Sequence, residues 1–545
     1  MDWEDGPFVF RINDNGIGPN LLLQVCLERG WREHSECGVI KDNWNLWWRT
    51  TGFPMSHYKQ LKPWQYTNHI PKGSSICRKD HLARYLRCMK KVYGSIFDFS
   101  PPCYQLPLEY TKLLAECSGS NRSNGRVRSG SFHCLEPPEE DVVWICKPVG
   151  QSQGRGIFLF REFSDLNYAS SAVVQKYVTN PLLIGGYKFD LRLYACIPSF
   201  RPLCVYLYRE GLVRFATDKF SLGDLNNLFR HLTNSSLNRL GPGYTRQKER
   251  VGAGCKWSLK QLRHYLNQNG ENDWLLWQRI ASIVALTVLA QNASSPPPPS
   301  PNCFEFYGFD ILVDTSLRPW LLEVNLSPAL GADSDVDAAV KKPMLHDMFD
   351  LLGMPVSHTG LSMFTSWQPP QEDSTSDSED YTTARPRLQR ARSLSILTGE
   401  DETEGLPSSR WSREDAGPVK VVPSSRWSRQ PQPMPPSFQN STVWGNGRDW
   451  RDAPAKDGDW VRVFPIGFSS NVKKKVSYVD HAAEIKAAVA DVHRFTKAAK
   501  EAAKLVELEA ETGKNRACFN DRVFNEAFRG IMGPEYTGEI WLPPK

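Results

Sequence analysis

Three oxygen-bearing side chains interrupt two strongly apolar runs in the second half of the chain. Asp310 lies in the first run, and Glu323 and Asn325 lie two residues apart in the second. If the runs form a hairpin centred on residues 316–317, Asp310 lies opposite Glu323, with Cβ atoms about 5 Å apart. Two carboxylates so close are unfavourable unless a cation lies between them, and hard oxygen ligands suit Mg²⁺. Surface or capping residues rarely interrupt such apolar strands, so the pattern favours a magnesium site.

A glycine-rich loop follows the apolar run that ends at Lys147. The segment 147–157 reads KPVGQSQGRGI and matches neither the P-loop nor the Rossmann fingerprint. A loop of this kind between strands is usually only a hairpin turn. Here Lys147 ends the preceding strand and Arg155 lies between Gly154 and Gly156, so two cations are placed to hold triphosphate oxygens beneath a flap.

A third group of polar residues lies on two strands that follow the loop. The segment 175–178 reads QKYV and offers backbone and lysine groups that could flank an adenine. Lys188, Asp190 and Arg192 alternate along one face of the next strand, although the solvated face of an edge strand would look the same. The order of flap, hinge strand, charged strand and metal hairpin is that of an ATP-grasp site, in which two α+β lobes clamp a nucleotide.

The apolar pattern predicts the elements that must position these groups. The predicted strands cover residues 8–12, 142–147, 156–160, 172–177, 188–197, 203–208, 304–313 and 320–324. The predicted helices cover residues 19–28, 78–86 and 274–291, the first opened by a proline and closed by a glycine. Residues 118–131 and 294–301 are rich in Ser, Gly, Asn or Pro and are interpreted as flexible insertions.

The core pattern ends near Gly353. Residues 365–460 are rich in Ser, Pro, Arg and Asp and contain the segment PSSRWSR twice. We expect this stretch to be disordered and dispensable for the chemistry, because it lacks apolar periodicity. An amphipathic helix is predicted at residues 482–510, more as a solvated tail helix than as a binding element.

Composition narrows the class of protein. The 545 residues carry a net charge of +6, which suits an acidic partner as well as an ordinary soluble protein. The 13 cysteines include no CxxC pair, which argues against zinc and for free thiols in a reducing compartment. Neither a signal sequence nor a membrane span is expected, because the most apolar run, residues 280–290, is too short.

Taken together, the motifs resemble those of the tubulin tyrosine ligase-like family, over about residues 8–353. The motifs that carry the resemblance are Lys147-Pro148, Gly154-Arg155-Gly156-Ile157, Gln175-Lys176-Tyr177, Lys188-Phe189-Asp190-Leu191-Arg192, His231-Leu232-Thr233-Asn234, Phe309-Asp310 and Glu323-Val324-Asn325-Leu326-Ser327-Pro328. Amino-terminal blocks at residues 44–48, 68–71 and 78–80 match as well. Within the family the chain most resembles the glutamate-adding branch.

The resemblance implies an α+β fold of the ATP-grasp type with a largely disordered carboxy-terminal tail. The expected parts are an amino-terminal α/β domain at 1–100, a central lobe with the flap at 101–186, a carboxy-terminal lobe with the metal hairpin at 187–356, and a mostly disordered tail at 357–545 with the helix near 482–510.

The resemblance also assigns site residues. Those implied for ATP are Lys147, Gly154, Arg155, Gly156, Gln175, Lys176, Tyr177, Val178, Lys188, Phe189, Asp190, Thr233 and Asn234. Asp310, Glu323 and Asn325 would bind two Mg²⁺ ions, and Arg192, Lys147 and Glu323 are the catalytic candidates. Arg155, Arg214, Ser236, Lys256 and Lys342, or its neighbour Lys341, would contact L-glutamate or the protein substrate. The chain departs from its relatives at Ser235, where an aromatic residue is usual.

The implied activity is ATP-dependent ligation of L-glutamate to glutamate γ-carboxylates in α- or β-tubulin tails. The carboxylate would attack the ATP γ-phosphate, and the amine of free glutamate would then attack the acyl-phosphate, with Arg192 stabilising the tetrahedral anion. The alternatives are a glycine or tyrosine ligase, a microtubule-binding pseudoenzyme and, on charge alone, a nucleic-acid-binding protein. We expect a monomer without nucleic-acid or membrane partners, in the cytoplasm and on the cytoskeleton, with cilium, flagellum and basal body as further locations.

Overall fold

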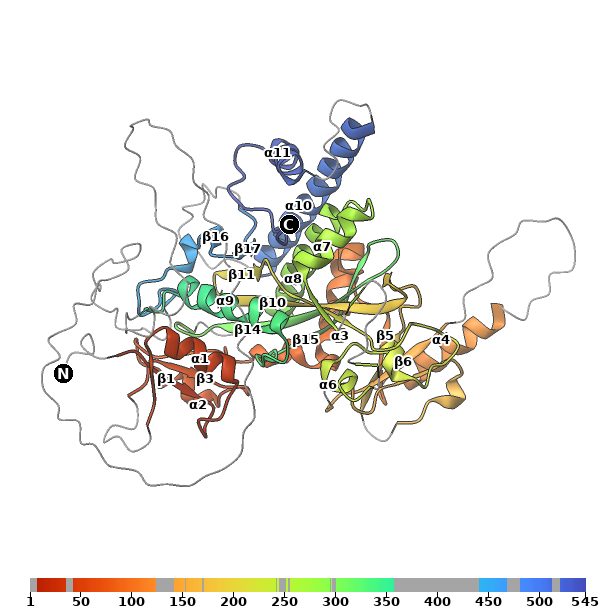
Figure 1. Ribbon diagram of the computed structural model, residues 1–545, viewed down its shortest axis with the longest axis horizontal. Coiled ribbons are helices and arrows are strands. Elements are labelled where there is room, and N and C mark those ends of the chain that lie inside the picture. Colours follow the sequence, from red (N-terminus) through yellow and green to blue (C-terminus); the bar gives the residue numbers. More distant parts are fainter. Residues whose placement is uncertain are drawn as a thin grey trace, which may run out of the picture.

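The computed structural model arranges the strands of the described residues in three β-sheets with covering helices (Figure 1). It describes residues 7–35, 43–123, 142–151, 153–168, 171–241, 243–244, 251–252, 255–294, 296, 300–356, 441–467, 481–511 and 520–545. The predicted α+β class is confirmed. The cysteines within these ranges are all free.

The first sheet lies near the amino terminus and is parallel throughout. Its order is β2 (Arg32–Glu33), β1 (Val9–Ile12), β3 (Leu46–Trp48) and β4 (Tyr66–Thr67). Helices α1 (Asn20–Glu28) and α2 (Met55–Tyr58) complete this unit, with Pro19 at the start of α1 as predicted. Figure 1 shows the unit in red, at the side of the large central sheet.

The second sheet carries the glycine-rich loop and lies at the opposite side of the molecule (Figure 1). Its order is β5 (Cys103–Leu106), β8 (Ala172–Lys176), β6 (Trp144–Pro148) and β7 (Phe158–Phe160), all antiparallel. Helix α4 (Tyr110–Ser123) packs beside β5, and α3 (Lys79–Tyr93) contacts β8. The predicted flexible insertion is helical up to residue 123, and its remainder lies outside the described residues.

The third sheet is the largest and holds the charged strand and the hairpin. Its main path is β13 (Lys256–Ser258), β12 (Leu212–Phe215), β10 (Tyr187–Phe200), β11 (Leu203–Tyr208), β17 (Trp460–Phe464) and β16 (Lys456–Asp457). The long β10 also pairs with β9 (Leu183–Ile184) and β14 (Glu305–Val313), and β14 pairs with β15 (Pro319–Asn325). Around the sheet lie α5 (Leu228–His231), α7 (Leu259–Gln268) and α9 (Asp335–Leu351), whereas α6 (Ser235–Asn238) packs against the second sheet through Leu237.

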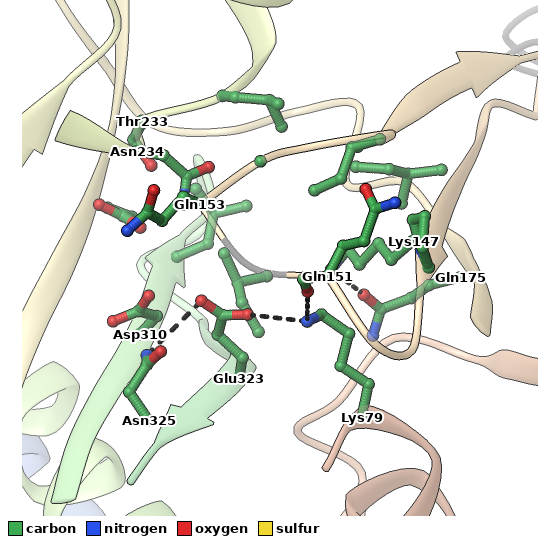
Figure 2. Close-up of a pocket in the computed structure, with 18 of the residues that line it drawn as sticks. Lys79, Lys147, Gln151, Gln153, Gln175, Thr233, Asn234, Asp310, Glu323 and Asn325 are labelled. Atoms are coloured by element: carbon green, nitrogen blue, oxygen red, sulfur yellow. Dashed lines mark hydrogen bonds and ion pairs between the residues drawn. The ribbon is translucent and has the colours of Figure 1, made fainter. Parts of the chain in front are cut away.

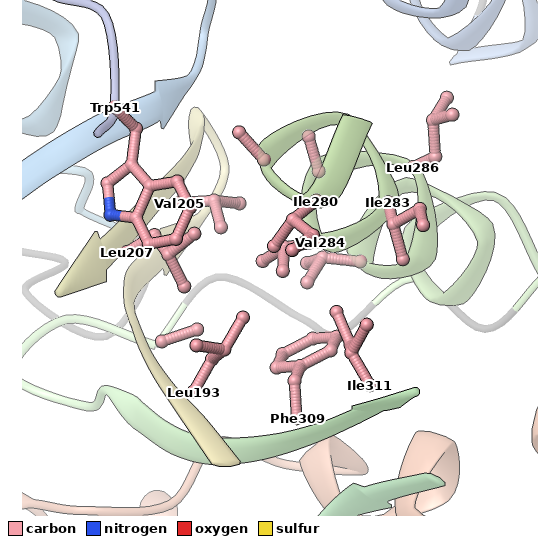
Figure 3. Close-up of a cluster of buried hydrophobic side chains, with 14 of the residues drawn as sticks. Leu193, Val205, Leu207, Ile280, Ile283, Val284, Leu286, Phe309, Ile311 and Trp541 are labelled. Atoms are coloured by element: carbon pink, nitrogen blue, oxygen red, sulfur yellow. The ribbon is translucent and has the colours of Figure 1, made fainter. Parts of the chain in front are cut away.

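Helix α8 (Trp274–Ser294) forms the centre of the main core and is apolar on nearly all sides. Figure 3 shows Ile280 and Val284 facing Leu193 and Phe309 of the sheet. The other side of α8 is covered by α10 (His481–Glu511), where the Ser282 and Thr496 hydroxyls lie 3.1 Å apart. Among the described helices α8 alone is long and apolar enough to cross a membrane, but most of it is buried within the protein, as in a core helix.

The structure differs from the predicted tail over the described parts of residues 441–545. Strand β17 joins the large sheet beside β11, and α10 and α11 (Asp521–Met532) pack on each other and on the core. Near the end of the chain Trp541 is 1 % exposed, and its indole N–H donates to the Tyr208 carbonyl at 3.0 Å. The helix predicted at residues 482–510 is present, but it is a core helix because its apolar face covers α8. Residues 357–440 lie outside the described residues, so their disorder stays a prediction.

Candidate active site

A cavity of about 340 Å³ lies between the second and third sheets. The flap after β6, the end of β8, the start of β10 and the β14–β15 hairpin form its walls, so it is built from the three predicted clusters (Figure 2). The residues predicted from the sequence that line it are Lys147, Gly154, Arg155, Gln175, Lys176, Tyr177, Val178, Lys188, Asp190, Thr233, Asn234, Asp310, Glu323 and Asn325.

Two residues predicted for ATP do not line the cavity. Phe189 is 1 % exposed and packs on Phe215, because the residue after Lys188 points to the opposite face of the strand. Gly156 instead shapes the flap: its φ is +66°, and a Cβ there would approach Gln151 Oε1 to 2.7 Å.

The hairpin pairs Asp310 with Glu323 as predicted, but its register shifts by one residue between Asp310 and Ile311, so the strands nearer the turn do not follow the predicted register. Asp310 pairs with Glu323 and Gly308 with Asn325, and the Asp314 carboxylate accepts from the Ser316 and Arg318 amides and so fixes the turn. Burial and the neighbouring Asp310 charge raise the pKa of Glu323. A cation between the two carboxylates would relieve that repulsion.

The hairpin residues fit a magnesium site only as part of a larger ligand set. No group of three His, Cys, Asp or Glu side chains gathers anywhere in the described ranges, so a metal here would depend on Asn325 and on oxygens from the substrates. Asn325 uses its amide nitrogen toward Glu323 Oε1, at 3.5 Å, which leaves its carbonyl oxygen for a ligand. Mg²⁺ commonly binds with one or two carboxylates plus phosphates and waters, and the residues present suit that mode.

Asp310 also belongs to a buried network of ion pairs. Arg192 donates to both of its oxygens, at 2.6 and 3.0 Å, and Arg214 Nη2 lies 2.9 Å from Oδ2. Arg214 in turn donates twice to Asp190, at 2.8 and 2.5 Å. Burial by itself would raise the pKa of Asp310, but the two guanidinium groups hold it well below its usual range.

These charges lie in two adjacent cross-strand rows of the large sheet, together called the charged row, which meet at Asp190 and Arg192 of β10. Registers join Lys256 on β13 to Arg214 on β12, Arg214 to Asp190 on β10, Arg192 on β10 to Asp310 on β14, and Asp310 to Glu323 on β15. The carboxylates of the hairpin lie at one end and Lys256 at the other. The row therefore offers a site for cations at the hairpin and a site for anions beyond Arg214.

Lysines form the opposite wall of the cavity. Lys147 Nζ donates to Gln175 Oε1 at 2.7 Å, and Lys188 Nζ donates to the Tyr177 hydroxyl at 2.8 Å and to the His231 carbonyl at 2.9 Å. Burial lowers the pKa of Lys188 to about 7. Burial also lowers the pKa of Lys147, although Glu323 opposes the shift. Both ammonium groups are therefore poised to gain from an anionic ligand.

Lys79 is a cavity residue that sequence reasoning missed. Its Nζ donates to the Gln151 carbonyl of the flap at 3.1 Å and lies 3.9 Å from Glu323 Oε2, as Figure 2 shows. The sequence shows a basic helix here, but not that α3 begins at Lys79 and points its first turn at the hairpin. His231 also lines the cavity. It belongs to one of the motifs that carried the family resemblance, but no role was assigned to it.

The residues predicted for the amino acid fall into separate places. Arg214 is 6 % exposed and does not line the cavity. Arg192 does not line it either, and its guanidinium is bonded to the cavity residue Asp310. Ser236 lies on α6 near Asn234 without lining the cavity.

The lysines predicted for the amino acid separate as well. Lys256 and Lys341 both contact Asp337, at 2.6 and 2.7 Å, whereas Lys342 pairs with Glu28 of the first unit at 2.7 Å. Of the two neighbours considered, Lys341 is thus the one that lies with Lys256.

Comparison with known proteins places these features in a family. Residues 56–360 match the model of the tubulin-tyrosine ligase family. The chain is 45% identical over 347 residues to the human and mouse proteins named probable tubulin polyglutamylase TTLL2, which covers 64% of this chain and 56% and 61% of theirs. It is 34% identical over 322 residues to mouse tubulin polyglutamylase TTLL5, covering 57% of this chain and 23% of that protein. The matched part is thus between half and two thirds of the length of the TTLL2 proteins.

Proposed function

This chain belongs to the tubulin-tyrosine ligase family, and we propose that it is an ATP-dependent ligase that joins L-glutamate to glutamate side chains in tubulin tails. The observation that carries the proposal is the cavity in which a lysine-lined wall faces the Asp310–Glu323 pair. That combination suits a nucleotide triphosphate bound with a divalent cation. The relatives named as tubulin glutamylases favour tubulin as the protein substrate.

Different residues of the cavity would bind the phosphates, the base and the Mg²⁺ ions in such a reaction. Lys147, Lys188 and Arg155 would neutralise phosphate oxygens, and the apolar wall near Ile145 and Leu322 would hold the base. Asp310, Glu323 and Asn325 would hold Mg²⁺, two ions in our proposal, which when bound withdraws charge from the phosphates.

The chemistry itself proceeds in two steps. A tubulin glutamate γ-carboxylate attacks the γ-phosphorus and ADP leaves, which gives an acyl-phosphate. The amine of free glutamate then attacks the acyl carbon, phosphate leaves, and an isopeptide bond remains. Arg192 would stabilise the tetrahedral anion once it turns from Asp310, the cavity-lining residue to which it is bonded. No step requires a nucleophilic side chain of the enzyme.

Glutamate is favoured over other amino acids by the cationic end of the row. Arg214, Lys256 and Lys341 lie beyond the cavity wall on the side away from the hairpin. A second carboxylate, which glycine and tyrosine lack, would have a cationic partner there. A microtubule-binding pseudoenzyme is disfavoured because Lys147, Asp310 and Glu323 are all present in the cavity. As a tubulin-modifying enzyme the protein would act, as a monomer, on the cytoskeleton in the cytoplasm and in cilia.

The proposal is tested by incubating the purified chain with microtubules, ATP, Mg²⁺ and one labelled amino acid at a time. We expect label in the tubulin tails with glutamate and not with glycine or tyrosine. The matched control is Glu323→Gln, which keeps the shape of the side chain but removes its charge, and which should abolish labelling while the circular dichroism spectrum stays unchanged. Labelling by glycine or tyrosine instead would establish the alternative ligases, and microtubule binding without any labelling would establish the pseudoenzyme.

A further inference from the structure

Asp337 joins two lysines at the cationic end of the charged row. Its Oδ2 accepts from Lys256 Nζ at 2.6 Å and from the Ser334 hydroxyl at 2.8 Å, and Lys341 Nζ lies 2.7 Å from its Oδ1. The carboxylate is fully buried, and the lysine side chains are 9 % and 4 % exposed. Two ammonium groups are thus held within reach of one carboxylate in a place that water hardly enters.

The position of this trio links it to the reaction site. Lys256 is the cross-strand partner of Arg214, which bonds to two of the carboxylates that line the cavity, Asp190 and Asp310. Tyr194 lies within electrostatic reach of Arg192 and Asp337. Its buried hydroxyl has no hydrogen-bond partner among the described residues.

Helix capping does not account for Asp337. The carboxylate lies in the first turn of α9, where Ser334 already accepts from the Asp337 amide as the cap. Asp335 occupies the same turn, is exposed, and supplies the usual acidic residue at a helix start. A capping role requires neither burial nor two lysines, one of which comes from β13 in another part of the sequence.

The charges of the region favour one class of amino acid. Arg192, Arg214, Lys256 and Lys341 supply four positive charges, and Asp190, Asp310 and Asp337 supply three negative ones. Lys256 and Lys341 therefore carry one positive charge that Asp337 does not compensate, and an amino acid of net charge −1 neutralises it. Glycine and tyrosine carry no net charge at neutral pH. Without Asp337 the two lysines would repel each other and lose their fixed positions.

We propose that Asp337 is a positioning residue that sets Lys256 and Lys341 as a paired cationic site for the carboxylates of a dicarboxylic amino acid. The inference rests on the proposed function, since it names the residue that orders the amino-acid end of that same site. The change in the KM for glutamate that positioning predicts has the opposite sign to the change that simple electrostatic attraction predicts. Asp337→Asn adds one net positive charge, so attraction alone would lower the KM for glutamate, whereas loss of positioning raises it.

The test is steady-state kinetics of Asp337→Asn with microtubules as acceptor. We expect the KM for glutamate to rise at least about tenfold while the KM for ATP changes less than about twofold. The control is Asp335→Asn, which removes an exposed carboxylate from the same helix turn and should leave both constants unchanged. An unchanged or lower KM for glutamate, or equal rises for both substrates, would overturn the proposal.

A second pair of variants keeps the test decisive if Asp337→Asn does not fold. Lys341→Met should raise the KM for glutamate, whereas Lys342→Met, one residue further on and paired with Glu28, should not. Equal effects of the two would also overturn the proposal.

Calorimetry separates the proposed function from the inference about Asp337. It measures binding of L-glutamate and of glycine to the wild-type chain in the presence of a non-hydrolysable ATP analogue and Mg²⁺. Failure of the wild type to bind glutamate counts against the proposed function. Equal binding by the wild type and Asp337→Asn counts against the inference alone.

Discussion

Replacing Arg214 by methionine removes the cation that joins two buried carboxylates. The guanidinium lies 2.5 and 2.8 Å from Asp190 oxygens and 2.9 Å from Asp310, and both acids are 2 % exposed. Removing one partner of a buried ion pair typically lowers stability by about 3–5 kcal/mol, because the remaining charge stays buried. Asp310 keeps Arg192, so most of the loss falls on Asp190. We therefore expect a decrease of about 3–5 kcal/mol in the free energy of unfolding.

Function should change with the same variant, and not for glutamate alone. Asp190 and Asp310 both line the nucleotide cavity, so their displacement alters that wall as well as the amino-acid end. We expect the KM values for ATP and for glutamate to rise together in Arg214→Met. If Arg214 only contacted the amino acid, as the family resemblance implies, its replacement would raise the KM for glutamate alone.

The assay is denaturant unfolding followed by tryptophan fluorescence, together with both KM values. Arg239→Met is the control, since its pair with Asp333 is exposed and should contribute less than about 1 kcal/mol. The double variant Arg214→Met, Asp190→Asn should recover part of the stability, because it also removes the stranded charge. A loss below about 1 kcal/mol with only the glutamate KM raised would refute the reasoning and assign Arg214 to direct amino-acid contact.

Three further predictions concern the buried side chains of Lys188 and Trp541. Because the pKa of Lys188 is about 7, the lysine loses its charge as pH rises, so kcat/KM for ATP should fall between pH 6 and 8; a flat profile in the wild type would contradict this. Unfolding restores a lysine pKa near 10, so the stability of the wild type relative to Lys188→Met should rise from about pH 7 to 10, as thermal unfolding at each pH would show. Trp541→Ala should lower the free energy of unfolding by about 3–5 kcal/mol in denaturant titrations. Leu508→Ala, at a residue 58 % exposed, should change it by less than about 0.5 kcal/mol, and equal losses would contradict the core position of Trp541.

The parts of the site that depend on local sequence were predictable. The pairing of Asp310 with Glu323 was predicted from a hairpin centred on residues 316–317, although the structure reaches this pairing through a one-residue register shift between Asp310 and Ile311. The flap lysine and arginine were likewise visible from glycine spacing. In each case the interacting residues lie within about fifteen positions of one another.

The parts that depend on strand order were not predictable from local patterns. Arg192 and Asp310 are 118 residues apart and meet only because β14 pairs with β10, and the resemblance that assigned both residues said nothing of that bond. Strand β17 was missed because its five residues lie among polar sequence and become buried only against β11, some 250 residues earlier. The expected disorder of residues 365–460 is therefore wrong at the carboxy-terminal end, where the chain enters the large sheet, and dispensability for the chemistry stays a prediction.

The packing of α10 on α8 has a consequence for folding during translation. The helix is complete at Ser294, but α10, which covers its outer side, begins at His481, nearly 190 residues later. At a synthesis rate of about 5–20 residues per second, the ribosome needs roughly 10–40 s to deliver that cover. During this time the nascent chain exposes a helix with scarcely any polar side, beside the open edge of β11. Chaperone capture during translation should therefore centre on α8, and substitutions on the inner face of α10 should reduce the yield of folded protein even where the finished enzyme is fully active.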